Sequence, residues 1–340
     1  MLLIPMQDRR IKMEKLLEVK NLKTYFYLDE GIVKAVDGVS FDIKREKTLG
    51  VVGESGCGKS VTALSILRIT GARSKIVEGE IIFYRDGDSV IDLAKLQPES
   101  EEMRSIRGKE ISMIFQEPMT SFSPVHTIGD QIMEAIILHQ KVNKKEARER
   151  AIEMLRRVKI PRAETVIDAY PHQLSGGMRQ RAMIAMALSC NPKLLIADEP
   201  TTALDVTIQA QILDLIQELQ KSFGMAVMII THNLGVIAEM AEDVIVMYLG
   251  KIVESASVEE IFYNPLHPYT RALLESIPKI GKKEKKRLKA IKGIVPDPYN
   301  LPTGCSFHPR CPEYMKGVCN KEAPELKEIK PGHKVSCLLY

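Results

Sequence analysis

Residues 53–60 read Gly-Glu-Ser-Gly-Cys-Gly-Lys-Ser, which fits the phosphate-binding pattern G-x-x-x-x-G-K-[ST] at every position. Glycines allow such a loop to point its backbone N–H groups inward at a polyphosphate, and a following helix adds its positive end. We expect Lys59 to reach the terminal phosphates and the Ser60 hydroxyl to ligate Mg²⁺. The expected nucleotide contacts in this stretch are Gly53, Ser55, Gly56, Cys57, Gly58, Lys59, Ser60 and Val61.

The segments on either side supply the context that this loop requires. Thr48–Val52 is apolar and β-branched enough for a buried strand, and Val61–Ile69 has its apolar residues at helical spacing. A chance glycine-rich turn would lack this strand and helix, so we interpret residues 53–60 as a phosphate-binding loop.

Polar side chains follow three other predicted strands. Gln116 has an amide oxygen that suits Mg²⁺ and an amide group that can orient a water molecule. Asp198 can hold Mg²⁺, Glu199 can polarise an attacking water, and His232 can contact the terminal phosphate. Taken alone, Gln116 would be an ordinary loop residue and His232 a structural histidine. The predicted strands are 110–115, 193–197 and 226–230.

A serine and two glycines open a further predicted helix. Ser175, Gly176 and Gly177 precede apolar residues at helical spacing that continue to about Ser189. The three residues either bind an anion at the helix start or form a simple serine cap. Residues 127–158 are also helical in pattern, which predicts an all-α insertion.

The N-terminal part is predicted to be mixed β structure. Leu16–Phe26 alternates apolar and polar residues and is interpreted as an edge strand, and Ile32–Ile43 as two short strands. Phe26 either stacks on a nucleotide base or packs within the sheet.

Composition excludes several classes of protein. The chain has 340 residues, 45% of them hydrophobic, which predicts a main domain with at least one appended part. A net charge of +4 without a basic groove argues against nucleic acid as a partner. No apolar run reaches the roughly 20 residues of a membrane helix, and no signal peptide is recognisable. We therefore expect a cytoplasmic protein.

Four of the six cysteines lie within the last 36 residues. Cys305, Cys311, Cys319 and Cys337 are separated by five, seven and seventeen residues, without the close pairs typical of zinc sites. Because disulfides are disfavoured in a reducing compartment, we expect metal ligation. Nearby basic residues, including Arg310, favour a [4Fe-4S] cluster over zinc or unligated thiols.

Taken in order, these stretches resemble the full set of motifs of ATP-binding-cassette (ABC) ATPases, over about residues 16–255. In that family they are the Walker A loop, the Q-loop at Gln116, the signature at 174–178, Walker B with its catalytic Glu199, the D-loop at 203–205 and the H-switch at His232. The resemblance implies ATP hydrolysis with Lys59, Gln116, Glu199 and His232 as catalytic residues. It implies Mg²⁺ held through Ser60, Gln116 and Asp198.

The resemblance also implies an α/β fold, namely an ABC-type P-loop NTPase with a mixed RecA-like sheet core. The expected domains are 14–116 with 190–255 as the ATP-binding core, 117–189 as an α-helical signature subdomain, and 256–340 as a Cys-rich extension. Two such cores pair head to tail, so that Ser175, Gly176 and Gly177 complete the partner's ATP site. Met178 departs from the glutamine usual there, which puts only a ribose contact in question.

The C-terminal part resembles the extension of ATPase subunits from dipeptide, oligopeptide and nickel importers. The resemblance lies in 264–270 (Asn-Pro-Leu-His-Pro-Tyr-Thr) and in 304–312 with its His-Pro-Arg-Cys-Pro. It implies a peripheral subunit at the cytoplasmic face of the cell membrane that powers peptide uptake. The implied partners are a sister ATPase or a second copy, two transmembrane permease subunits and, indirectly, a substrate-binding protein.

Alternatives remain at this point. The same subunit could serve nickel or oligosaccharide import, or belong to a soluble ABC ATPase of DNA repair or translation. A GTPase would need an Asn-Lys-x-Asp box, which neither Asn143-Lys144 nor Asn320-Lys321 begins, and a non-hydrolysing scaffold would be expected to lack Glu199 or His232. The basic run Lys282–Lys292 is either solvated linker or attracted to anionic lipid.

Overall fold

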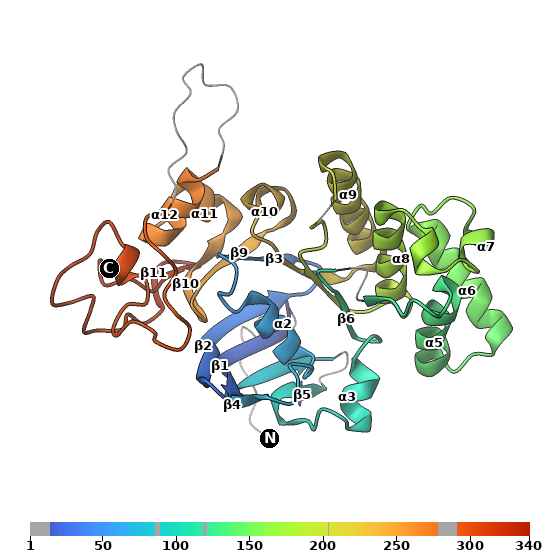
Figure 1. The fold of residues 1–340 in the computed structure, drawn as a ribbon, viewed down its shortest axis with the longest axis horizontal. Coiled ribbons are helices and arrows are strands. Elements are labelled where there is room, and N and C mark those ends of the chain that lie inside the picture. The colour runs from blue at the N-terminus through green and yellow to red at the C-terminus, as the bar shows by residue number, and fades with distance from the viewer. Residues whose placement is uncertain (1–13, 86–88, 118–120, 203, 278–290) are drawn as a thin grey trace, which may run out of the picture. The chain divides into compact units, whose positions relative to one another are not determined.

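The structure is a computed structural model that describes residues 14–85, 89–117, 121–202, 204–277 and 291–340 (Figure 1). Its contacts divide the chain into two compact units. Among the described residues, the first unit comprises 14–16, Ile43–Lys47 and those within Leu96–Ile230. The second comprises Leu17–Asp42, Thr48–Lys95 and Thr231–Tyr340, so it contains the phosphate-binding loop and the C-terminal extension.

An antiparallel sheet occupies the N-terminal part of the second unit. Its strands are β1 (Lys15–Leu28), β2 (Gly31–Lys44), β4 (Ser74–Tyr84) and β5 (Val90–Asp92), in the order β2-β1-β4-β5. The predicted edge position of β1 is wrong, because β1 lies between β2 and β4. Residues 32–43 form one strand, β2, where two short ones were expected.

A second set of strands in this unit carries the phosphate-binding loop. The order is β11-β12-β10-β9-β3, in which β3 pairs with β9 in parallel and β9 with β10 in antiparallel orientation. All five residues of β3 are buried, as their apolar side chains predict. The bounds are β3 (Thr48–Val52), β9 (Asp243–Tyr248), β10 (Lys251–Ser257), β11 (Lys327–Lys330) and β12 (His333–Val335).

Short helices complete the second unit. The helix after the loop, α2 (Lys59–Ile66), begins two residues earlier than its apolar spacing predicts. The others are α10 (Leu234–Met240), α11 (Val258–Tyr263), α12 (Pro268–Glu275) and the 3-10 turns η1 (Leu93–Lys95) and η3 (His308–Arg310).

The first unit contains a parallel run of three strands and most of the helices. β7 pairs in parallel with β6 on one side and with β8 on the other, and all three strands are fully buried. The helices expected over 127–158 are present as α5 and α6, which pack on each other and on α8. The bounds are α3 (Glu101–Ile106), β6 (Ile111–Ile114), α5 (Ile128–Gln140), α6 (Lys144–Arg157), α7 (Ala163–Val166), η2 (Pro171–Gln173), α8 (Gly176–Leu188), β7 (Leu194–Asp198), α9 (Val206–Phe223) and β8 (Ala226–Ile230).

Within these described ranges, none of the helices is both long enough and apolar enough to cross a bilayer.

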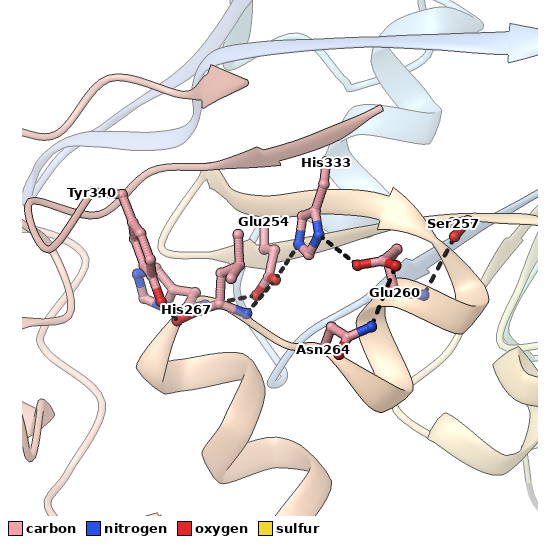
Figure 2. A network of polar contacts seen from close by, with 8 residues as sticks. Glu254, Ser257, Glu260, Asn264, His267, His333 and Tyr340 are labelled. Atoms are coloured by element: carbon pink, nitrogen blue, oxygen red, sulfur yellow. Dashed lines mark hydrogen bonds and ion pairs between the residues drawn. The ribbon is translucent and has the colours of Figure 1, made fainter. Parts of the chain in front are cut away.

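A buried polar network attaches the start of the extension to β10 (Figure 2). Glu254 on β10 is completely buried and accepts hydrogen bonds from the backbone N–H groups of Leu266 at 2.7 Å and His267 at 2.9 Å. Its Oε1 also lies 2.7 Å from Nε2 of His333 on β12, whose other ring nitrogen contacts Glu260 at 3.3 Å. The network joins segments that are up to 79 residues apart in the sequence.

Candidate functional site

The phosphate-binding loop closes tightly on the strands beneath it. A Cβ at Gly53 would lie 2.2 Å from the Met247 carbonyl oxygen, so only glycine fits there. Gly58 precedes α2 with a φ of 97°, a conformation that glycine adopts without strain. Lys59 is 5% exposed, and its Nζ donates to the carbonyl oxygens of Gly53 at 2.8 Å and Glu54 at 2.9 Å. The lysine charge therefore lies inside the loop.

The remaining predicted contacts of the loop differ in exposure. Ser55 and Gly56 are exposed, and Ser60 and Val61 are half-buried at the start of α2. Cys57 is buried beside Lys59, and burial raises the pKa of its thiol; its nucleotide contact remains a prediction. Phe26 on β1 is half-buried, which leaves its base-stacking role a prediction.

A cavity of about 380 Å³ in the second unit brings His232 and the loop together. His232 is exposed and follows Thr231, a buried residue whose Oγ1 accepts from the Asn233 N–H at 3.0 Å. A histidine at this cavity can approach a phosphate held by the loop. The lining residues are Val52, Gly53, Glu54, His232, Leu234, Leu273, Ser276 and Ile291.

In the first unit, Glu199 and Gln116 meet at the carboxyl ends of neighbouring parallel strands. The Gln116 Nε2 donates to the Glu199 Oε2 at 3.2 Å, and the Thr202 hydroxyl donates to the same oxygen at 2.8 Å. Glu199 has a φ of 47°, a left-handed conformation that is uncommon for a residue other than glycine. Its N–H donates to the carbonyl oxygen of Ile230 at 2.8 Å. The carboxylate is thus oriented by two donors and its own backbone.

Asp198 is the last residue of β7 and is 4% exposed. The proposed Mg²⁺ ligands are a hydroxyl in the second unit, Ser60, and an amide and a carboxylate in the first, Gln116 and Asp198. Each of these side chains offers an oxygen donor of the kind that Mg²⁺ prefers, and its contact with the ion remains a prediction.

The predicted signature residues begin α8. The Ser175 side chain accepts from the Met178 N–H at 3.3 Å, and Ser175 and Gly176 are exposed. Gly177 is half-buried, and a Cβ there would lie 3.1 Å from Ile208 of α9. The serine is therefore a helix cap, and its role at a partner's ATP site remains a prediction.

The predicted iron–sulfur cluster is contradicted by the structure. Across the part of the chain that is described, which includes all four cysteines of the extension, no group of three or more Cys, His, Asp or Glu side chains is arranged to hold a metal ion. All four thiols are free, and burial raises the pKa of Cys311 to about 11 and also raises those of Cys305 and Cys337.

Two residues of the extension contact the phosphate-binding loop, and neither contact was predicted from the sequence. Arg310 pairs with Glu54, and the Tyr269 hydroxyl accepts from the Glu54 N–H. Both residues lie in the stretches that resemble the importer extension, but nothing in those stretches indicates a contact with Glu54. Residues 282–290 of the basic run at 282–292 lie outside the described residues, so the role of this run remains a prediction.

Comparison with known proteins assigns both parts of the chain. Residues 36–202 match a family described as ABC transporter, and residues 253–319 match one described as oligopeptide/dipeptide transporter, C-terminal region. The chain is 54% identical to the oligopeptide transport ATP-binding protein AppD of Bacillus subtilis strain 168, covering 96% of this chain and 98% of that protein. It is 47% identical to the dipeptide transport ATP-binding protein DppD of Escherichia coli K12, covering 95% and 96%.

A solved structure supports the same family assignment. The dimeric post-hydrolysis state of the ATP-binding cassette MJ0796, bound to ADP and Pi, superimposes with a TM-score of 0.62 at 29% identity. The match covers 72% of this chain and 99% of that chain. The α/β fold with a mixed sheet, predicted from the sequence, is thereby confirmed.

Proposed function

Because this chain belongs to the ABC transporter family of ATP-binding proteins, we propose that it is the ATP-hydrolysing subunit of a membrane importer of peptides. The observation that carries the proposal is similarity over nearly the whole chain, including the C-terminal region, to proteins named for oligopeptide and dipeptide transport. Residues 253–319 match a model described as oligopeptide/dipeptide transporter, C-terminal region, so the similarity extends beyond the ATPase part of the chain.

The chemistry assigned to the residues follows their types. The loop N–H groups and Lys59 bind the phosphates, and Glu199 accepts a proton from a water molecule while Gln116 and Thr202 hold its carboxylate in place. The water oxygen bonds to the γ-phosphorus as the bond from that phosphorus to the β–γ bridging oxygen breaks, which gives ADP and phosphate. His232 contacts the γ-phosphate.

Mg²⁺, when bound through Ser60, Gln116 and Asp198, would neutralise phosphate charge. ATP and Mg²⁺ are the ligands that this proposal requires.

The proposed assembly is a dimer, with a sister ATPase or a second copy. Ser175, Gly176 and Gly177, exposed or half-buried at the start of α8, complete the partner's site. Two ATP molecules close the dimer and hydrolysis reopens it. The dimer acts at the cytoplasmic face of the membrane, where it drives two permease subunits. A substrate-binding protein delivers the peptide to these permease subunits. Residues 117–189 form the signature subdomain, 14–116 with 190–255 the core, and 256–340 the extension.

Uptake in cells tests the proposed function. In a strain lacking the gene, the wild-type chain is expected to restore uptake of a radiolabelled tripeptide, whereas Glu199→Gln is not. Glu149→Gln, an exposed position on α6, is the matched control and should restore uptake. Restoration of nickel or oligosaccharide uptake without peptide uptake would replace the peptide assignment by one of those cargoes.

A further inference from the structure

The phosphate-binding loop contains a carboxylate at a position where charge repulsion is expected. Glu54 directly follows Gly53, and its side chain is 27% exposed. It also lines the 380 Å³ cavity that His232 shares. A polyphosphate bound by this loop would be repelled by a carboxylate nearby, since like charges in a partly buried site are poorly screened.

Arg310 of the extension neutralises this carboxylate with a two-pronged ion pair. Its Nη1 lies 2.6 Å from the Glu54 Oε2 and its Nη2 lies 3.0 Å from the Oε1. The guanidinium is fixed by further contacts, since Nε donates to the Lys292 carbonyl at 3.2 Å and Nη1 to the Tyr248 hydroxyl at 3.3 Å. The Arg310 side chain is 4% exposed, so solvent screens the pair weakly.

The extension also holds the backbone of the same loop residue. The Tyr269 hydroxyl on α12 accepts from the Glu54 N–H at 2.9 Å. Tyr269 is completely buried against Tyr248, with ring centroids 4.7 Å apart, and against Phe307, at 5.3 Å. The backbone N–H and the carboxylate of Glu54 are therefore both held by residues that lie more than 200 positions later in the chain.

We propose that Arg310 is a positioning residue for nucleotide binding: by pairing with Glu54, the C-terminal extension removes a repulsive charge from the phosphate-binding loop and fixes the loop for ATP. The proposal deepens the proposed function and rests on it. Arg310 contacts neither the phosphates nor the reacting atoms, so its removal should weaken ATP binding and leave the chemical step nearly unchanged.

A charge cycle on the full-length protein tests this. Titration with a fluorescent ATP analogue should show Arg310→Met binding about tenfold to a hundredfold more weakly. This is less than the full effect of removing one partner of a buried charge pair, because the Glu54 side chain is 27% exposed. The double variant Arg310→Met with Glu54→Gln should recover to within about threefold of wild type, because no unpaired carboxylate remains. In ATPase assays, KM should rise while kcat stays within about twofold.

The control is Arg271→Met, which breaks the 2.8 Å ion pair between Arg271 and Glu313 inside the extension and should leave ATP affinity unchanged. Should Arg310→Met fail to fold, Arg310→Lys keeps the charge but loses the two-pronged geometry, and we expect it to bind ATP several-fold more weakly.

Three results would overturn the proposal: an Arg310→Met affinity within about twofold of wild type, a double variant as weak as Arg310→Met, or an Arg310→Lys affinity equal to wild type. A failure of the proposed ATPase function gives a different result, namely equal ATP affinity in wild type and in Lys59→Ala. That result would rule out both proposals, whereas the three results above would rule out only the role of Arg310.

Discussion

Removal of the Glu254 side chain should loosen the start of the C-terminal extension more than any nearby carboxylate change. Glu254 is completely buried and accepts from the N–H groups of Leu266 and His267 (Figure 2). In Glu254→Ala the buried N–H of His267 and the half-buried N–H of Leu266 both lose this acceptor, and each such loss costs about 1–3 kcal/mol. The two together give roughly 2–6 kcal/mol, before the contact with His333 is counted.

The conservative variant separates the two oxygens. In Glu254→Gln the amide oxygen can still accept from Leu266 and contact His333, as Oε1 does, but an NH₂ group then faces the His267 N–H. We therefore expect Glu254→Gln to cost about 1–3 kcal/mol, less than Glu254→Ala.

Hydrogen exchange followed by mass spectrometry is the assay, because it reports local opening without requiring the whole chain to unfold in one step. Protection of the Leu266 and His267 amides should fall about thirtyfold or more in Glu254→Ala. Glu260→Gln, which changes the weaker 3.3 Å contact on the other side of the His333 ring, is the control and should change protection little. Protection in Glu254→Ala within threefold of wild type would refute the reasoning.

Two further predictions concern the same part of the chain. Phe307 is 1% exposed among the rings of Tyr248 and Tyr269, so Phe307→Ala should lower the free energy of unfolding by about 3–5 kcal/mol, whereas a similar loss in Tyr263→Ala, at an 82% exposed side chain, would contradict this. Burial lowers the pKa of His267 to about 3, so as the pH falls its imidazole is protonated in the unfolded chain before it is protonated in the folded chain. The stability that is present above about pH 6.5 is therefore lost as the pH falls toward 3. Between pH 6.5 and 5 this amounts to about 1.6 kcal/mol, measured as the difference in unfolding free energy between wild type and His267→Asn; equal pH slopes for the two would exclude it.

Local pattern predicted the elements that carry the candidate site. The buried strand before the phosphate-binding loop has the expected bounds, and α8 buries Met183, Ala187 and Leu188 as its spacing predicts. Such features depend on neighbours in the sequence, so periodicity and turn chemistry are sufficient. The edge position assigned to β1 was wrong because alternation reports which face of a strand is buried and is silent about its pairing partners.

Features that join distant segments were beyond prediction. The Glu54–Arg310 pair spans 256 residues, and no local pattern identifies which of many basic residues reaches the loop. The four cysteines illustrate the converse error. Their closeness in sequence suggested metal ligation, yet ligation depends on side chains converging in space and on thiolate formation, neither of which spacing determines.

We infer that this chain hydrolyses ATP with Glu199 activating the water molecule. The most direct measurement compares steady-state phosphate release and ATP binding in wild type, Lys59→Ala and Glu199→Gln. In Glu199→Gln, Gln116 and Thr202 can still donate to the side-chain oxygen, so turnover should fall about a hundredfold or more while ATP affinity stays within about threefold. Lys59→Ala should lose ATP binding itself. Turnover by Glu199→Gln at the wild-type rate would show that Glu199 does not activate the water molecule.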